Sequence, residues 1–160
     1  MSNDNLSASQ QPEAIQAALA KPRIAIVGLS SNELRASNFV GYYMLRNGYT
    51  VIPVNPREKE IFGLECYPSI EAVPEPVDVV DVFRDPSAVP DIARASVAAG
   101  AQFLWLQFGV ISPEGVAIAE EGGMTCIVDR CIKIEHARYR GRMHWLGFNT
   151  ERISAQRGDA

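Results

Sequence analysis

The sequence has few of the residues that build disulfide frameworks or metal sites. It contains 3 cysteines and 2 histidines in 160 residues, and no two cysteines form a C-x-x-C pair. An odd number of irregularly spaced cysteines argues against a disulfide framework and favours a reducing compartment. No metal-ligand spacing and no nucleophile elbow is recognisable. We therefore expect a cytoplasmic protein with no metal site and no catalytic residues, although an enzyme is not ruled out.

Long apolar runs and an excess of positive charge are also missing. No run approaches the roughly 18 apolar residues that cross a bilayer, and the N-terminus lacks the pattern of a secretion signal. A formal net charge of −4 provides no general basic field for nucleic acid. We expect no membrane or nucleic-acid partner. The exception is a basic stretch that is typical of a solvated helix face but could attract RNA or an acidic protein surface: Arg130, Lys133, Arg138, Arg140 and Arg142.

What the sequence does contain is a regular alternation of buried strands and amphipathic helices. Strands are predicted over 23–27, 50–55, 77–83, 102–107 and 124–128, and helices over 12–20, 37–47, about 86–99, 113–121 and 131–139. This alternation predicts an α/β fold, a Rossmann-like, doubly wound, five-stranded parallel sheet with helices on both faces. The strand order that we expect is 3-2-1-4-5. The domain is predicted to span 11–146, between a disordered tail at 1–10 and a polar tail at 147–160.

Three residues do not suit their predicted elements without further assumptions. Pro53 cannot donate to a strand ladder, so we expect irregular or reduced pairing there. Asp78 and Asp81 interrupt the apolar third strand and are expected near its ends or on a partly exposed face.

Ser37 is expected to be the N-cap of the helix that follows the first strand.

The turn after the first strand resembles a phosphate-binding turn only in part. A dinucleotide turn has glycine at its first, third and sixth positions, which here are Gly28, Ser30 and Glu33. The second strand ends at Asn55 instead of the acidic residue that binds the ribose of NAD. A neutral residue would tolerate a phosphate that a carboxylate would repel. A plain α/β turn without ligand remains an equally good interpretation of the turn alone.

Ligands of such sheets bind beyond the carboxyl ends of the strands, where the strand order reverses. The segments that follow the first four strands are 28–32, 55–59, 83–85 and 107–110. Together with the end of the fifth strand, they resemble the CoA-binding domain family, which includes stand-alone proteins and the N-terminal domain of the succinyl-CoA synthetase α subunit. The matching segments are 24–30 (IAIVGLS), 48–56 (GYTVIPVNP), 80–84 (VDVFR), 104–110 (LWLQFGV) and 128–136 (VDRCIKIEH).

The resemblance implies that coenzyme A, free or as an acyl-CoA, lies across the carboxyl edge of the sheet. It implies a phosphate contact from the loop after the first strand, an adenosine contact from the loop after the second, and two further walls. The residues it assigns are Gly28, Leu29, Ser30, Ser31, Asn32, Arg35, Asn55, Pro56, Lys59, Phe83, Arg84, Gln107, Phe108 and Gly109. The synthetase loop is glycine-rich around its lysine, whereas residues 57–60 here are REKE. The phosphate contact could therefore be Arg57 or Lys59.

Other reactive residues have a structural and a functional interpretation. Cys131 beside Arg130 could be a redox thiol, although a packed small residue is favoured. His136 and His144 are expected to be structural or surface residues, and Phe103, Trp105 and Phe108 to belong to the core. The synthetase's phosphohistidine domain is expected to be absent.

Taken together, these features predict a non-catalytic module that binds CoA or acyl-CoA. An NAD-linked oxidoreductase or a remnant of a CoA ligase or transferase is the alternative. The oligomeric state is left open, a homo-oligomer included.

Overall fold

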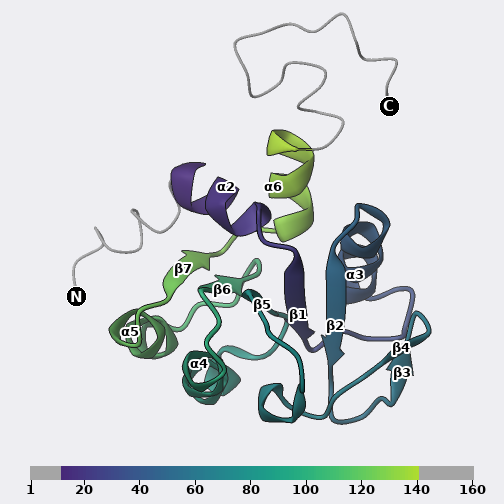
Figure 1. The fold of residues 1–160 in the computed structure, drawn as a ribbon, viewed down its shortest axis with the longest axis horizontal. Helices are drawn as coiled ribbons and strands as arrows, with labels where there is room; N and C mark the ends of the chain where they lie inside the picture. The colour runs from purple at the N-terminus through teal and green to yellow at the C-terminus, as the bar shows by residue number, and fades with distance from the viewer. Residues whose placement is uncertain (1–11, 141–160) are drawn as a thin grey trace, which may run out of the picture.

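The computed structural model describes residues 12–140, and they form a five-stranded parallel sheet with helices on both faces (Figure 1). The predicted α/β, Rossmann-like class is confirmed. The predicted tails, together with Arg142 and His144, lie outside the described residues. In chain order the elements are α2 Pro12–Leu19, β1 Arg23–Val27, α3 Ala36–Arg46, β2 Thr50–Val54, β3 Glu60–Ile61, β4 Leu64–Glu65, the 3₁₀ turn η1 Ile70–Ala72, β5 Val79–Val82, the 3₁₀ turn η2 Pro86–Ala88, α4 Val89–Ala98, β6 Phe103–Leu106, α5 Pro113–Glu121, β7 Thr125–Val128 and α6 Ile132–Tyr139.

The strand order is β2-β1-β5-β6-β7, so the predicted order 3-2-1-4-5 was wrong. The third long strand, β5, lies between β1 and β6 instead of beyond β2. Pro53 provides a physical reason. Proline lacks the N–H that a central strand needs on both sides, and the observed order places its strand, β2, at the edge of the sheet. Its carbonyl accepts a hydrogen bond from the Tyr67 N–H (3.0 Å) on the open side of β2. The N–H that proline lacks would point to the same side, where no ladder requires it.

This order moves the reversal point of the sheet to the gap between β1 and β5. The chain leaves β1 toward β2 and leaves β5 toward β6, in opposite directions. A short hairpin, β3–β4, was not predicted. It follows β2 in the chain and lies beyond the edge of the sheet that β2 forms (Figure 1). The crevice for a ligand is therefore expected between the loop after β1 and the end of β5.

The two faces of the sheet carry separate hydrophobic clusters. Helices α4 and α5 cover one face, and α2, α3 and α6 cover the other. Phe103 and Trp105 are buried in the second cluster, as predicted, but Phe108 is 61% exposed and does not belong to the core. No helix among residues 12–140 is long and apolar enough to cross a membrane.

Asp81 contradicts the expectation that it lies near a strand end or on a partly exposed face. It is fully buried within β5, between Ile26 of β1 and Trp105 of β6. Neither of its carboxylate oxygens has a hydrogen-bond partner among the described residues. Burial raises the pKa of Asp81 well above its ordinary range, because a charged carboxylate is poorly solvated there. Asp78, in contrast, precedes β5 and accepts a hydrogen bond from the Arg23 N–H (3.1 Å), as expected of a strand end.

Candidate functional site

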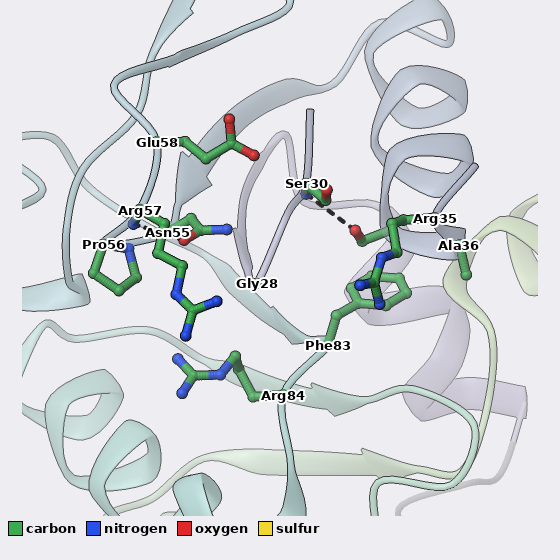
Figure 2. A pocket seen from close by; sticks show the side chains of 11 residues that line it. Gly28, Ser30, Arg35, Ala36, Asn55, Pro56, Arg57, Glu58, Phe83 and Arg84 are labelled. Carbon is green, nitrogen blue, oxygen red and sulfur yellow. Dashed lines mark hydrogen bonds between the residues drawn. The ribbon is translucent and has the colours of Figure 1, made fainter. Parts of the chain in front are cut away.

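A cavity of about 730 Å³ opens at the reversal point between β1 and β5 (Figure 2). Its volume falls within the range of about 300–1,000 Å³ that is usual for small-molecule sites. Three loops build it: the one after β1, the one after β2 and the one after β5. The lining residues are Gly28, Ser30, Arg35, Ala36, Ser37, Asn55, Pro56, Arg57, Glu58, Phe83 and Arg84.

Gly28 brings the loop after β1 close to the end of β5. Its φ of +91° lies in the left-handed region, and a β-carbon at this position would collide with the Phe83 carbonyl oxygen. The Gly28 N–H donates to the Val54 carbonyl (2.8 Å). A glycine at the first turn position is therefore required by packing between three strands, whether or not a ligand is bound.

The backbone N–H groups of this loop are largely engaged within the protein. The Ser30 N–H donates to the Ser37 hydroxyl (3.1 Å), the Ser31 N–H to the Glu58 carboxylate (2.7 Å) and the Asn32 N–H to the Ser30 hydroxyl (3.0 Å). The resemblance implies that N–H groups 28–32 face phosphate, and in this structure those of Gly28, Ser30, Ser31 and Asn32 have acceptors within the protein. A ligand would have to displace one of these acceptors.

The N-terminus of α3 offers free donors instead. The helix begins at Ala36 with Arg35 as its N-cap, so Ser37 lies within the helix and is not the N-cap as predicted. The Ser37 hydroxyl instead holds the loop through Ser30. Among the described residues, the N–H groups of Ala36 and Ser37 have no acceptor, and both residues line the cavity. Free N–H groups at a helix N-terminus attract anions.

Three arginines give the cavity a positive lining. Arg35 precedes α3, Arg57 follows β2 and Arg84 follows β5. None of the three forms an ion pair within residues 12–140. Figure 2 shows the Arg57 and Arg84 side chains reaching the same part of the cavity. Guanidinium groups gathered without carboxylate partners favour a ligand with several negative charges.

Asn55 connects two of the loops. Its Nδ2 donates to the Leu29 carbonyl (2.9 Å), and its Oδ1 accepts from the Arg57 N–H (2.9 Å). The first bond holds the loop after β2 against the loop after β1, and the second fixes the turn within the loop after β2. Asn55 thereby positions Arg57 at the cavity. Of the two cations considered for a phosphate contact, Arg57 lines the cavity and Lys59 does not.

Several residues that the resemblance assigned lie outside this cavity. Leu29 is buried in the core, Asn32 and Lys59 do not line the cavity, and Ser31 lines a separate depression with Phe39 and Tyr42. Seven of the assigned residues line the cavity: Gly28, Ser30, Arg35, Asn55, Pro56, Phe83 and Arg84. Ala36 and Ser37 were not foreseen, and Glu58 was expected only as part of the segment 55–59.

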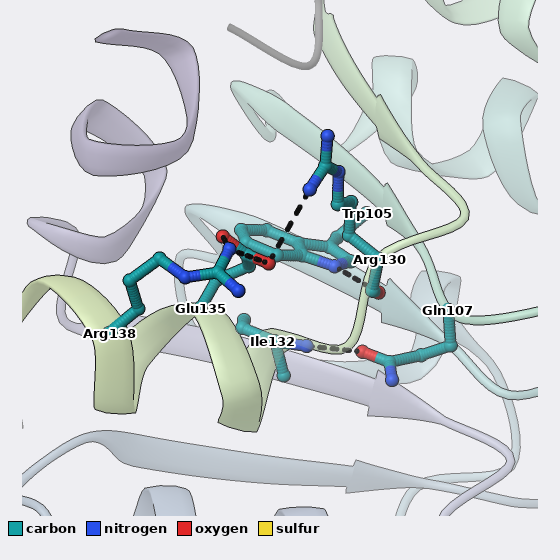
Figure 3. Close-up of polar contacts among 6 residues, drawn as sticks. All are labelled: Trp105, Gln107, Arg130, Ile132, Glu135 and Arg138. Atoms are coloured by element: carbon teal, nitrogen blue, oxygen red, sulfur yellow. Dashed lines mark hydrogen bonds and ion pairs between the residues drawn. The ribbon is translucent and has the colours of Figure 1, made fainter. Parts of the chain in front are cut away.

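Residues 107–109, expected as a further wall of the CoA site, lie outside this cavity, and two of them form hydrogen bonds between loops. Gln107 is buried, and its Oε1 accepts from the Ile132 N–H (3.1 Å) at the start of α6 (Figure 3). The Gly109 N–H donates to the Asp129 carboxylate (2.9 Å). These bonds join the loop after β6 to the loop after β7, and none of residues 107–109 lines the cavity.

The basic stretch and His136 make contacts within the protein. Arg130 and Arg138 both pair with the buried carboxylate of Glu135, at 3.7 and 3.1 Å (Figure 3). His136 is buried, and its Nδ1 lies 2.9 Å from the Tyr43 hydroxyl. Burial, and secondarily Arg140, lowers the pKa of His136. The contacts of His136 agree with the structural interpretation.

Cys131 is buried and directly precedes α6. No group of three or more His, Cys, Asp or Glu side chains within the described residues could hold a metal ion.

The fold and the site together define a Rossmann-like domain with a positively charged cavity at its reversal point. Comparison with known proteins assigns the chain to a family. Residues 22–137 match the family described as CoA binding domain, and the chain belongs to that family. The resemblance noted from the sequence is therefore confirmed.

The relatives include proteins of similar length and much longer enzymes. The chain is 38% identical over 115 residues to the uncharacterized protein YneT of Bacillus subtilis, covering 72% of this chain and 85% of YneT. A solved hypothetical protein from Pyrococcus horikoshii is 35% identical with a TM-score of 0.78, covering 80% of this chain and 91% of that one. The chain is also 30% identical to an ADP-forming acetate–CoA ligase of Archaeoglobus fulgidus, covering 68% of this chain but 17% of the ligase.

Proposed function

We propose that this protein binds coenzyme A or an acyl-CoA in the cavity between β1 and β5, without catalysing a reaction itself. Membership of the CoA binding domain family supports the ligand class. The observation that carries the proposal is the set of three arginines, Arg35, Arg57 and Arg84, that line the cavity without an ion-pair partner in the described part of the chain.

The number of these cations suits the charges of CoA. Coenzyme A carries a diphosphate and a separate phosphate on its ribose, and each can accept paired hydrogen bonds from a guanidinium. The free N–H groups of Ala36 and Ser37 add a further anion contact at the N-terminus of α3. NADH has the diphosphate alone, so it would leave part of this positive charge unmatched. NADPH carries a third phosphate and is the stricter competitor.

Isothermal titration with CoA, acetyl-CoA, dephospho-CoA, NADH and NADPH tests the proposal. We expect CoA and acetyl-CoA to bind, and dephospho-CoA to bind more weakly because it lacks the ribose phosphate. Arg57→Gln and Arg84→Gln should each weaken CoA binding about tenfold or more, consistent with a charge-assisted hydrogen bond of roughly 1.5–3 kcal/mol. Arg94→Gln is the matched control, since Arg94 pairs with Asp91 on the exposed side of α4.

Two outcomes would count against CoA. A flat titration with all three CoA compounds would remove the proposal, and tighter binding of NADH than of CoA would favour the oxidoreductase alternative. Mass spectrometry of small molecules released on denaturing the purified protein gives an independent answer, because it assumes no ligand in advance.

The similarity to acetate–CoA ligase favours a second candidate, a protein that presents CoA to a separate catalytic chain. The matching region makes up 17% of that ligase, so the ligase contains extensive further sequence. The tagged protein can be purified from cells and assayed for formation of acyl-CoA. An activity that co-purifies with it, and that the protein alone does not have, would support this candidate. CoA binding without any such activity would leave the simple binding role.

A further inference from the structure

Glu58 places one carboxylate inside a cavity that is otherwise positively charged. Its side chain follows Arg57 in the loop after β2 and lines the same cavity as Arg35 and Arg84. The carboxylate does not pair with any of these arginines within the described residues. Its Oε2 instead accepts a hydrogen bond of 2.7 Å from the Ser31 N–H. Figure 2 shows Glu58 on the side of the cavity away from the Arg84 guanidinium.

We propose that Glu58 is an internal competitor of the ligand, a tethered carboxylate that occupies the Ser31 N–H until a phosphate group displaces it. The inference rests on the proposed function and adds a determinant of affinity to the same site. A carboxylate and a phosphate oxygen accept the same kind of charge-assisted hydrogen bond from a backbone N–H. Ser31 itself lines the separate depression beside Phe39, but the Glu58 carboxylate that its N–H binds lines the cavity. A phosphate drawn into the cavity would repel that carboxylate and compete with it for the N–H.

Glu58 is suited to be displaced, whereas Asn55 is not. Both residues connect the loop after β2 to the loop after β1. Asn55 does so through a partly buried bond from its Nδ2 to the Leu29 carbonyl, and its Oδ1 is held by the Arg57 N–H within its own loop. Glu58 does so through a hydrogen bond that is exposed to solvent. Releasing the Glu58 bond would free the Ser31 N–H while the bond between Asn55 and Leu29 keeps the two loops together.

The consequence is an affinity that Glu58 holds below the value the arginines alone would give. Removing the negative charge should strengthen the binding of anionic ligands. The gain is expected to be modest, because exposed charge interactions are worth roughly 0.2–1 kcal/mol, which corresponds to about a 1.4- to fivefold change in affinity. Ligands with more phosphate charge should show the larger gain.

Glu58→Ala tests the inference, and Glu65→Gln is the matched control. The alanine removes the acceptor of the Ser31 N–H, whereas Glu58→Gln removes the charge but can keep that bond through its amide oxygen. Glu65 in β4 carries the same charge and lines neither the cavity nor the depression that Ser31 shares with Glu60. We expect Glu58→Ala to bind CoA about 1.4- to fivefold more tightly and to shift the Ser31 amide resonance, and Glu58→Gln to gain less. Glu65→Gln should leave CoA affinity and that resonance nearly unchanged.

Three results would overturn the inference. Weaker CoA binding by the Glu58 variants would mean that the carboxylate contacts the ligand favourably, as an acceptor for a ribose hydroxyl would. Equal gains in Glu58→Ala and Glu65→Gln would mean a general effect of net charge. If no CoA compound binds any form, the proposed function fails, and pyrophosphate serves as the probe. Tighter pyrophosphate binding by Glu58→Ala than by wild type would then support the competition, and equal binding would overturn it.

Discussion

The carbonyl oxygen of Phe83 occupies the space that a β-carbon on Gly28 would need. Gly28→Ala would therefore force the loop after β1 away from the end of β5 and would also hold alanine at a φ of +91°. We expect it to lower the free energy of unfolding by more than about 1 kcal/mol, measured by urea denaturation. CoA binding should weaken as well, because both loops line the cavity.

Gly48→Ala separates the two causes of that loss. Gly48 has the same φ of +91°, but a β-carbon there would meet no atom within 4 Å. Its alanine variant should lose only the conformational part, about 1 kcal/mol. Equal losses in the two variants would show that contact with Phe83 is not what requires glycine at position 28.

The positions of individual strands and helices could largely be predicted from the sequence. The strand at Arg23–Val27 was predicted at the residues where it is found, because its apolar run ends at a glycine. The start of α5 followed from Ser112 and Pro113, and the Ser112 hydroxyl does accept the Gly115 N–H (3.1 Å). Such signals depend on neighbouring residues, so the sequence contains them in full.

The strand order and half of the site were not readable in the same way. Which side of β1 receives β5 is decided by the packing of a long connection, and Pro53 was the single local hint that β2 lies at the edge. Gln107 is the first residue after β6, as Phe83 is after β5, yet the first caps α6 and the second lines the cavity. Side-chain direction after a strand depends on contacts between loops that lie far apart in the sequence.

Gln107→Ala should destabilise the protein without changing its affinity for CoA. The Gln107 Oε1 is the acceptor for the buried Ile132 N–H, and an unpaired buried donor costs about 1–3 kcal/mol. Urea denaturation measures that loss, and titration of the folded variant with CoA should match wild type. A variant of normal stability that binds CoA poorly would instead place Gln107 in the site.

The three thiols are expected to react slowly in the native protein. Cys66, Cys126 and Cys131 are all free and buried. Burial, with a smaller contribution from Glu120, raises the pKa of Cys126 to about 12, and burial raises the pKa of Cys66 as well. Iodoacetamide at pH 7 should therefore modify all three fully in guanidinium chloride but slowly without it.

Mass spectrometry of the protein after iodoacetamide treatment without denaturant tests the role of Cys131. We expect its alkylation to be no faster than that of free cysteine, since the side chain is 8% exposed. Rapid modification of Cys131 alone, with Cys126 as the internal reference, would restore the interpretation as a redox thiol.

Asp81→Asn should change how stability depends on pH. The native pKa of Asp81 lies well above its ordinary value of 3.8, because the carboxylate is buried without a partner among the described residues. Between the unfolded and the native pKa the native state holds a proton that the unfolded state has released, so wild-type stability falls as pH rises through that window. Asparagine does not titrate. The variant should therefore gain stability relative to wild type as pH rises from about 4, by about 1 kcal/mol or more near neutral pH.

Urea denaturation of both proteins at several pH values between about 4.5 and 9 measures that difference. Asp78→Asn is the matched control, because Asp78 is half-buried and its oxygen accepts the Arg23 N–H, a bond that an amide oxygen can keep. Its difference from wild type should not grow in the same direction with pH. A constant difference between Asp81→Asn and wild type across this range would mean that Asp81 has the same protonation state folded and unfolded. Its burial in β5 would then have to be compensated by a partner that the native structure does not provide among residues 12–140.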